Sequence, residues 1–274
     1  MRGFTRSPYA MRILSAPIAS LRCGAALLAL CATLGLVPVW RCAPRRWNMR
    51  RSVARLGWAV LLSGFGIRVR RHGELADPAG ALIVANHISW VDIAVLAGVA
   101  DAGFIAKAEI ASWPVIGRLA SLYGCLFVER NSRAGLQSLA QEMGAHPERS
   151  GLILFPEGTT GGGDGVLPFR SSLFACIGER WPAVQPVTIA YRTRAGGVLS
   201  PQARRRIAWL DDDALLPHAF ALAAVGGAVV DVWIEPCFTA ASRKDAAETS
   251  YRLIAARLEA IAARDQAATL KRAA

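Results

Sequence analysis

The chain has 274 residues, of which 53% are hydrophobic, enough for one sizeable α/β domain with an appendage and a core that needs no disulfide or metal. Its formal net charge is +12, and residues 1–80 carry +11 of this, with 13 Arg against Glu74 and Asp77. Because these arginines adjoin the most apolar segments, and no nucleic-acid-binding signature accompanies them, the charge favours anionic lipid over nucleic acid as the partner.

The six cysteines are scattered, without a Cys-x-x-Cys pair and without a histidine at metal-ligand spacing. Such cysteines are typical of small buried side chains in a reducing compartment. We therefore expect neither a disulfide nor a metal site.

Two apolar runs lie in the N-terminal region. The first extends from Cys23 to Trp40 and has no charged residue. Its eighteen residues are at the lower limit for a helix that crosses a hydrocarbon core of about 30 Å with a rise of about 1.5 Å per residue. The second run, Leu56 to Ile67, is too short to span a membrane.

Arginines on both sides of the first run prevent the positive-inside rule from orienting a single span. A pair of interfacial or re-entrant helices, with both ends on the cytoplasmic face of the inner membrane, agrees better with these charges. A cleaved signal peptide is disfavoured, because an arginine cluster follows the run and no small-x-small site does. We assign residues 1–66 to a membrane-associated helical region and residues 67–274 to an α/β domain; spanning and one-leaflet attachment both stay open.

Strand-like and helix-like segments alternate from residue 67 onward. Strands are expected at residues 67–71, 81–86, 104–107, 126–130, 151–155, 184–191 and 228–235. Helices are expected at residues 90–98, 113–123, 136–145, 170–179 and 216–225, and from about residue 242 to the C-terminal end. This alternation predicts an α/β fold with a central, mostly parallel sheet covered by helices, whose ligands bind in loops beyond the strand ends.

The stretch after the second strand reads Asn-His-Ile-Ser-Trp-Val-Asp over residues 86–92. Ser89, with an acid three residues on, is typical of a helix N-cap. His87 is then on the strand-to-helix turn, and Asp92 is in the first helical turn, where the helix dipole favours its ionised form. A carboxylate beside an imidazole fixes the tautomer and makes the other ring nitrogen a better base. The simpler alternative is a loop histidine and a capping aspartate.

Two further strands run into loops with polar residues. Gly-Cys-Leu-Phe-Val-Glu-Arg over residues 124–130 ends in Arg130, which is suited to an anionic headgroup. Phe-Pro-Glu-Gly-Thr over residues 155–159 leads a buried strand into a glycine-rich loop, whose amides can approach an anion or oxyanion. A surface arginine and an ordinary turn are the simpler alternatives for each stretch alone.

Together and in this order, the three stretches resemble the glycerolipid acyltransferase family, typified by bacterial 1-acyl-glycerol-3-phosphate acyltransferase. That family carries Asn-His-x-x-x-x-Asp, then Gly-x-x-Phe-[Ile/Val]-[Asp/Glu]-Arg, then Phe-Pro-Glu-Gly-Thr. Its fourth motif, a strand with a proline, is matched by Val-Gln-Pro-Val-Thr-Ile over residues 184–189. The resemblance covers about residues 80–190 and extends loosely to the basic, apolar N-terminus.

The resemblance implies a membrane-bound O-acyltransferase that moves a fatty acyl group from acyl-CoA or acyl carrier protein to the free hydroxyl of a lysolipid. His87 would be the general base that takes the hydroxyl proton, and Asp92 would orient it and stabilise the imidazolium. No cofactor and no covalent enzyme intermediate are implied, and the chain has no Gly-x-Ser-x-Gly nucleophile elbow.

The resemblance also implies substrate-binding residues. Arg130 would hold the polar head of the acceptor. The oxyanion and acceptor region would be shaped by Glu157, Gly158 and Thr159. Lys107 would lie near the acyl or acceptor entrance.

One position departs from the pattern of many phosphate-accepting members, which carry an arginine or similar residue after Glu-Gly-Thr. Thr160 stands there, so a phosphate acceptor lacks one expected cation unless Arg170 supplies it. The pattern from Glu-Gly-Thr-Thr to Val-Leu-Pro-Phe-Arg over residues 157–170, followed by Ser-Ser-Leu-Phe over residues 171–174, resembles the branch that acylates lyso-ornithine lipid, whose headgroup has no phosphate. Leu-Leu-Pro-His over residues 215–218 also resembles that branch, although His218 alone is equally explained as a capped helix residue. We expect 1-acyl-sn-glycerol-3-phosphate as the acceptor, which would yield phosphatidate, with lyso-ornithine lipid as the alternative. A non-catalytic lipid-binding protein is disfavoured, because the chain retains the whole motif set.

Overall fold

A computed structural model of the chain describes most of its residues. The described ranges are 16–35, 49–76, 81–100, 102–113, 116–122, 124–129, 132–145, 151–174, 177, 181–210 and 213–273. Arg130 of the second motif lies outside these ranges, as do Cys42 and Cys176.

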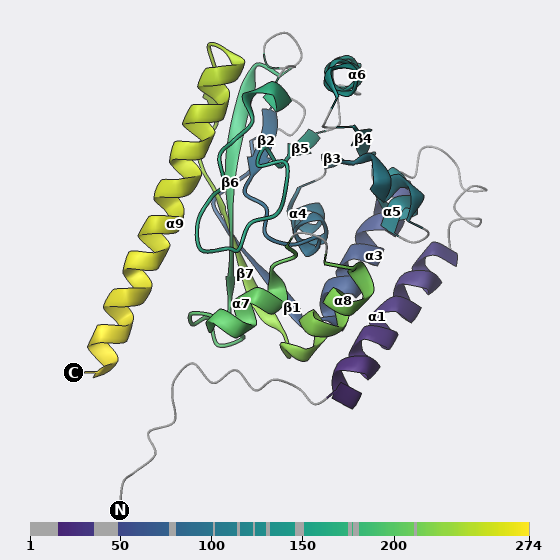
Figure 1. The fold of residues 1–274 in the computed structure, drawn as a ribbon, viewed down its shortest axis with the longest axis vertical. Helices are drawn as coiled ribbons and strands as arrows, with labels where there is room; N and C mark the ends of the chain where they lie inside the picture. Colours follow the sequence, from purple (N-terminus) through teal and green to yellow (C-terminus); the bar gives the residue numbers. More distant parts are fainter. Residues whose placement is uncertain are drawn as a thin grey trace, which may run out of the picture.

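The centre of the described structure is an eight-stranded sheet in the order β1-β7-β6-β2-β5-β3-β4, with β8 paired to β6 (Figure 1). The strands are β1 (Ile67–His72), β2 (Ala81–Ala85), β3 (Ala102–Lys107), β4 (Leu126–Val128), β5 (Gly151–Leu154), β6 (Ala183–Arg192), β7 (Ala228–Ile234) and β8 (Phe238–Thr239). All pairs are parallel except β6 with β7 and β6 with β8. The predicted α/β fold with a mostly parallel sheet is confirmed.

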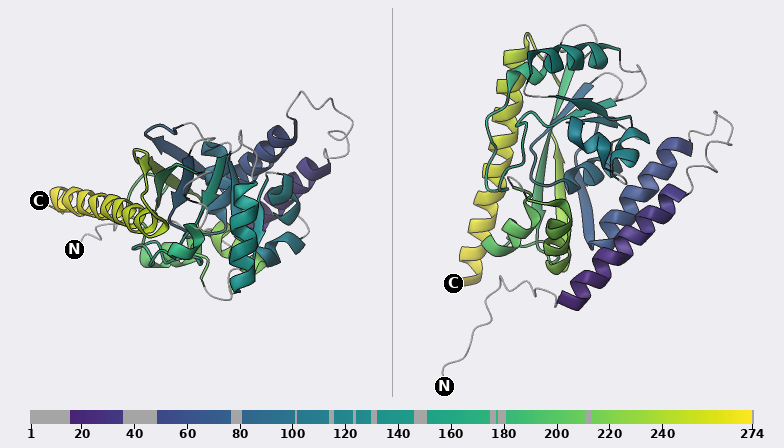
Figure 2. Two further views of the ribbon diagram at one scale, coloured as in Figure 1. Left: turned by 90° about the horizontal axis from the view of Figure 1, so that it is seen from above. Right: turned by 45° about the vertical axis from the view of Figure 1, so that its right-hand side comes forward.

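Helices cover both faces of this sheet. They are α1 (Ala16–Gly35), α3 (Met49–Gly64), α4 (Val91–Val99), α5 (Ile116–Leu122), α6 (Arg133–Gly144), α7 (Pro201–Ile207), α8 (Leu215–Ala224) and α9 (Arg243–Ala273), with short 3₁₀ turns at Ala108–Ser112 and Ser171–Phe174. The long helix α9 packs along β6 on one side, while α4, α3, α1 and α8 gather on the other (Figures 1 and 2).

The two faces of β2 show why its sequence is apolar at every position. Ile83 and Ala85 belong to the core cluster beneath α3, α4 and α8, whereas Leu82 and Val84 belong to the cluster beneath α9. Successive side chains of a strand point to opposite faces, and a parallel sheet is buried on both. Because β2 is buried on both faces, it gives the turn at residues 86–90 a fixed starting position.

The N-terminal apolar runs are helical within the described residues and pack on the α/β body. α1 and α3 lie side by side, and Trp58, Leu61 and Phe65 join the core cluster of the sheet. A Cβ added at Gly64 would lie 2.5 Å from the Ala26 Cβ, so the close approach of the two helices requires glycine there. Among the described helices, none has the length and apolar character needed to cross a membrane.

Two expectations from the sequence were wrong, and two elements were missed. The helix expected at residues 170–179 is a 3₁₀ turn at Ser171–Phe174, and Ile177 forms an isolated bridge with Trp181. Its Leu173 and Phe174 are buried in the cluster beneath α9, so tertiary packing sets the local conformation. α7 and β8 were not predicted. Cys31 is exposed, although Cys23 is buried as expected.

Candidate active site

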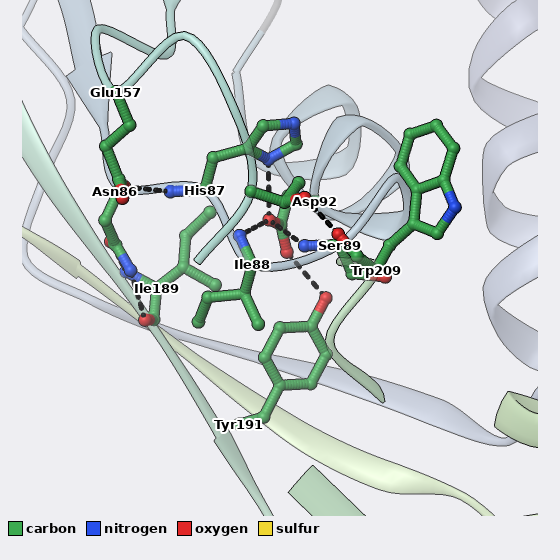
Figure 3. A network of polar contacts seen from close by, with 10 residues as sticks. Asn86, His87, Ile88, Ser89, Asp92, Glu157, Ile189, Tyr191 and Trp209 are labelled. Carbon is green, nitrogen blue, oxygen red and sulfur yellow. Dashed lines mark hydrogen bonds and ion pairs between the residues drawn. The ribbon is translucent and has the colours of Figure 1, made fainter. Parts of the chain in front are cut away.

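His87 and Asp92 form a hydrogen-bonded pair at the carboxyl end of β2 (Figure 3). His87 Nδ1 lies 2.9 Å from Asp92 Oδ2, and the imidazole stacks on Phe155 with ring centroids 4.0 Å apart. The His87 side chain is 12% exposed, whereas that of Asp92 is fully buried. Because Nδ1 donates to the carboxylate, Nε2 carries the lone pair and can accept a proton.

Three other donors hold the Asp92 carboxylate in place. Oδ2 accepts hydrogen bonds from the backbone N–H groups of Ile88 at 2.6 Å and Ser89 at 2.8 Å. Oδ1 accepts one from the Tyr191 hydroxyl at 2.6 Å (Figure 3). Hydrogen bonds offset the cost of burying a carboxylate, and here they fix both oxygens of Asp92 in position beside His87.

Tyr191 was not predicted as a site residue. It comes from β6, 99 residues after Asp92, and no local pattern in the sequence connects the two. Burial, followed by the charge of Asp92, raises the pKa of the Tyr191 phenol well above its usual value. The phenol therefore keeps its proton and serves as a fixed donor to the carboxylate.

The predicted serine N-cap is wrong in its details. α4 begins at Val91, its N-cap residue Trp90 makes no side-chain capping bond, and the Ser89 hydroxyl has no hydrogen-bond partner among the described residues. The Ser89 backbone makes the contacts instead: its N–H donates to the Asp92 carboxylate, and its carbonyl accepts from the Asp92 N–H. The Asp92 carboxylate, in the first turn of α4, thus accepts the backbone N–H groups that precede the helix and also binds the His87 imidazole.

Glu157 joins the third motif to the first. This carboxyl group is buried; Oε1 accepts from the His87 backbone N–H at 2.7 Å and Oε2 from the Leu167 N–H at 2.9 Å. Burial raises the pKa of Glu157 to about 7, although both backbone donors oppose the shift. The Gly161 N–H donates to the His87 carbonyl at 2.7 Å. The glycine-rich loop is therefore fastened to both sides of the His87 backbone.

Arg170 lies beside the turn at Gly158. Gly158 has φ +72°, and a Cβ added there would be 3.1 Å from Arg170 Nε. The backbone N–H of Arg170 donates to the Pro156 carbonyl at 2.9 Å. The side chains of Arg170 and Thr159 are exposed. The Thr160 hydroxyl donates to the Trp209 carbonyl. The Arg170 side chain is thus exposed to solvent next to Gly158, while the Thr160 hydroxyl attaches the loop to the backbone at Trp209.

Lys107 is not part of the hydrogen-bonded group around His87. It ends β3, its side chain is 55% exposed, and Nζ pairs with Glu109 at 2.8 Å. Within the described residues, no three His, Cys, Asp or Glu side chains gather in a way that could hold a metal ion.

A cavity of about 420 Å³ adjoins the residues that hold Asp92. Ile88 and Tyr191 form part of its wall, together with apolar side chains of β6, α7 and α9. Ile207 of α7 and Ile261 of α9 are among them. Leu199, which precedes α7, and the charged side chains of Arg192, Arg204 and Asp265 also line the cavity. The site therefore combines a proton acceptor with a nearby cavity whose wall is partly apolar and partly charged.

Comparison with known proteins identifies the family. The family model "Acyltransferase" matches residues 66–190. A lyso-ornithine lipid O-acyltransferase of Brucella abortus is 38% identical over 76% of this chain and 79% of its own length. The chain belongs to this acyltransferase family. The resemblance inferred from the motifs is confirmed, and the protein is an acyltransferase.

Other relatives of this acyltransferase carry two names. A lyso-ornithine lipid O-acyltransferase of Rhizobium meliloti is 37% identical over 69% of this chain, which spans 66% of that relative. A 1-acyl-sn-glycerol-3-phosphate acyltransferase of Neisseria meningitidis is 36% identical over 54% of this chain and 59% of its own. The crystal structure of the 1-acyl-sn-glycerophosphate acyltransferase PlsC of Thermotoga maritima shares the fold, with a TM-score of 0.59, 19% identity and coverage of 88% of this chain and 98% of that one.

Proposed function

We propose that this acyltransferase moves a fatty acyl group from acyl-CoA or acyl carrier protein to the free hydroxyl of a lysolipid, with His87 as the general base. The observation that carries the proposal is the 2.9 Å pair between His87 and a buried Asp92 carboxylate that is held by three further donors. This arrangement supports one tautomer of the imidazole, with Nε2 as the proton acceptor.

The proposed reaction is a direct transfer. Nε2 of His87 takes the hydroxyl proton as the hydroxyl oxygen forms a bond to the thioester carbonyl carbon, and the Asp92 carboxylate stabilises the imidazolium. When the tetrahedral intermediate collapses, the carbon–sulfur bond breaks and the thiol leaves with the proton from Nε2. Such proton transfer contributes about 10²–10⁴-fold to the rate. No cofactor, metal or covalent enzyme intermediate takes part in this scheme.

We propose 1-acyl-sn-glycerol-3-phosphate as the acceptor, with phosphatidate as the product. The exposed guanidinium of Arg170 beside Gly158 supports this, because it supplies a cation close to the loop where the family pattern has one after Glu-Gly-Thr. Arg130 would hold the same headgroup. The turn of Gly158 and Thr159, braced by Glu157, would shape the acceptor and oxyanion region.

Lyso-ornithine lipid is the second candidate acceptor. The Thr160 hydroxyl is engaged with the Trp209 carbonyl, so this position offers no charge to a phosphate. Three relatives that are 37%, 38% and 40% identical to this chain bear the name lyso-ornithine lipid O-acyltransferase. A headgroup that lacks phosphate requires fewer cations.

We also propose attachment to the cytoplasmic face of the inner membrane through the N-terminal helices. On α1 the side chains of Leu21 and Leu28 are 74% and 73% exposed, in the part of the sequence that carries most of the net positive charge. Exposed apolar side chains beside basic residues are typical of helices that lie in the membrane interface.

Lys107 would lie near the entrance for the acyl chain or acceptor.

Thiol release from acyl-CoA and from acyl carrier protein tests the proposal. Membranes with the wild-type chain receive lysophosphatidate or lyso-ornithine lipid, and the His87→Ala variant is the blank. We expect release with at least one acceptor and none in the variant. Arg170→Gln separates the acceptors: it should raise KM for lysophosphatidate and leave KM for lyso-ornithine lipid nearly unchanged. Turnover retained in His87→Ala would refute the mechanism.

A further inference from the structure

Helix α8 is apolar on every side, but only one side is covered. It reads Leu-Leu-Pro-His-Ala-Phe-Ala-Leu-Ala-Ala and carries no Asp, Glu, Lys or Arg. A helix that is apolar all round is normally buried all round. Its inner residues, such as Leu222 and Ala223, are buried, whereas Leu216 and Phe220 are 56% and 43% exposed. These two residues are four apart and therefore lie on one side of the helix.

The helix next to α8 also exposes apolar side chains. α8 packs against α1, and the two helices lie side by side near the same end of the sheet (Figures 1 and 2). On α1, Ile18, Leu21 and Leu28 are 48%, 74% and 73% exposed. We call the exposed side chains of Ile18, Leu21, Leu28, Leu216 and Phe220 the α1–α8 apolar surface.

The inner side of α8 is attached to the turn that carries His87 and Asp92. The Trp90 indole N–H donates to His218 Nδ1 at 3.0 Å, and His218 Nε2 lies 3.0 Å from the Ala208 carbonyl. An indole can only donate, so Nδ1 accepts and Nε2 carries the hydrogen. Burial lowers the pKa of His218, which agrees with a neutral ring. The position of α8 is thereby connected to Trp90, between the two residues of the pair.

We propose that α8 is a lipid-contacting helix, whose outer side enters the interface of an anionic bilayer beside α1 and holds the His87–Asp92 turn close to that bilayer. The inference rests on the proposed function, because a lysolipid acceptor resides in such a bilayer.

The charges around the α1–α8 apolar surface favour lipid as its occupant. Arg22 lies within α1, and the last turn of α7, which packs against α8, contains Arg204, Arg205 and Arg206. Arg204 Nη1 lies 3.8 Å from Asp164 Oδ2. Arg205 pairs with Asp213. A surface of exposed leucine and phenylalanine bordered by arginine matches the acyl chains and anionic headgroups of one leaflet.

Vesicle binding of the purified full chain tests this role. The variants are Leu216→Glu and Phe220→Glu, and Leu270→Glu on α9 is the matched control, since Leu270 is 65% exposed on a different helix. Co-sedimentation uses phosphatidylcholine vesicles with and without phosphatidylglycerol. We expect each α8 variant to lose about tenfold or more in binding to the anionic vesicles, because a buried large apolar side chain contributes roughly that much. Binding equal to that of Leu270→Glu would overturn the proposal.

Photo-cross-linking to lipid tests the same role without introducing a glutamate on α8. Phe220 is replaced by the photo-reactive residue benzoylphenylalanine, which keeps an aromatic ring at this position, and Leu270 is replaced in the same way as the control. Irradiation with anionic vesicles should yield lipid adducts at position 220 in excess of those at position 270. A cross-link to a second copy of the chain, or equal yields at the two positions, would contradict the role of α8.

Turnover in solution separates this inference from the proposed function. Thiol release is measured with a short-chain lysolipid below its micelle concentration, where no bilayer is needed. The α8 variants should then match the wild-type rate within about twofold. Loss of wild-type turnover in this assay would count against the proposed function, whereas unchanged vesicle binding of the α8 variants would count against the lipid-contacting role alone.

Discussion

Replacement of Asp92 with asparagine separates the charge of the carboxylate from its geometry. Oδ2 accepts from two backbone N–H groups, those of Ile88 and Ser89, and from His87 Nδ1. The amide must keep its oxygen at this position, because an NH₂ group would face N–H donors. The NH₂ then points to the Tyr191 oxygen, whose hydroxyl can rotate to accept. Asp92→Asn thus retains the turn and the histidine tautomer while it removes the negative charge.

In the proposed mechanism an imidazolium forms in the transition state, and the expected loss follows from its interaction with the Asp92 carboxylate. Two unit charges about 4 Å apart interact by about 4 kcal/mol at an effective dielectric constant of about 20. The Asp92 side chain is fully buried, so salt and water screen it little. A general base gains its charge only when it takes the proton, so most of this energy is absent in the ground state of the proposed reaction. Since about 1.4 kcal/mol corresponds to a tenfold change in rate, we expect kcat to fall about 10²–10³-fold with little change in KM.

The assay is continuous detection of the released thiol at saturating acyl-CoA, with kcat and KM determined for the acceptor. His87→Ala sets the blank. Asp245→Asn is the matched control, because the Asp245 carboxylate also accepts a backbone N–H, that of Ala241 at 2.8 Å, but at the exposed start of α9. A kcat loss under tenfold in Asp92→Asn, or a rise in KM at unchanged kcat, would refute the reasoning.

Three further predictions concern the support of the pair. Tyr191→Phe removes the 2.6 Å bond to Asp92 and should lower the unfolding free energy in urea by about 1.5–3 kcal/mol, with a loss in kcat; an unchanged urea midpoint would contradict this. The folded chain keeps the Glu157 proton up to about pH 7, whereas the unfolded chain releases it from about pH 4.5, so this residue lowers stability as pH rises through that interval. Glu157→Gln should abolish this part of the pH dependence in urea titrations, and an identical slope would exclude the assignment. Gly158→Ala places a Cβ at positive φ and 3.1 Å from Arg170 Nε, so we expect about 1–2 kcal/mol lower stability and a raised acceptor KM.

The sheet could be predicted from the sequence because its central strands are apolar at every position. Residues 81–85 and 151–154 lie inside a parallel sheet with both faces covered, and burial on both faces leaves no polar position to obscure the pattern. The segment at residues 170–179 lacked such a signal. Its apolar residues fill the space beneath α9, and a sequence window cannot show that α9, which begins only at Arg243, supplies the packing partner.

In the site, too, contacts between residues close in the sequence could be predicted, whereas contacts between distant residues could not. The five-residue spacing of His87 and Asp92 predicted their hydrogen bond, because one turn of chain between a strand and a helix brings them together. Ser89 shows the limit of a local pattern: serine followed by an acid three residues on predicts a hydroxyl cap, but the backbone N–H of Ser89 makes the contact. Tyr191 is a long-range partner, and only the pairing of β6 with β2 reveals it.

Sheet topology explains why motifs far apart in the chain meet at one turn. β2 lies between β5 and β6 and is parallel to both, so the carboxyl ends of these three strands lie at the same end of the sheet. After β2 the chain proceeds to β3 on the β5 side and later returns to β6 on the other side, which makes the end of β2 a topological switch point, where α/β sheets bind their ligands. Glu157 reaches the turn from the β5 side and holds the His87 backbone, while Tyr191 reaches it from the β6 side and holds Asp92. His87 and Asp92 are thus fixed independently from two neighbouring strands, and a change on either side should loosen one residue while the other stays in place.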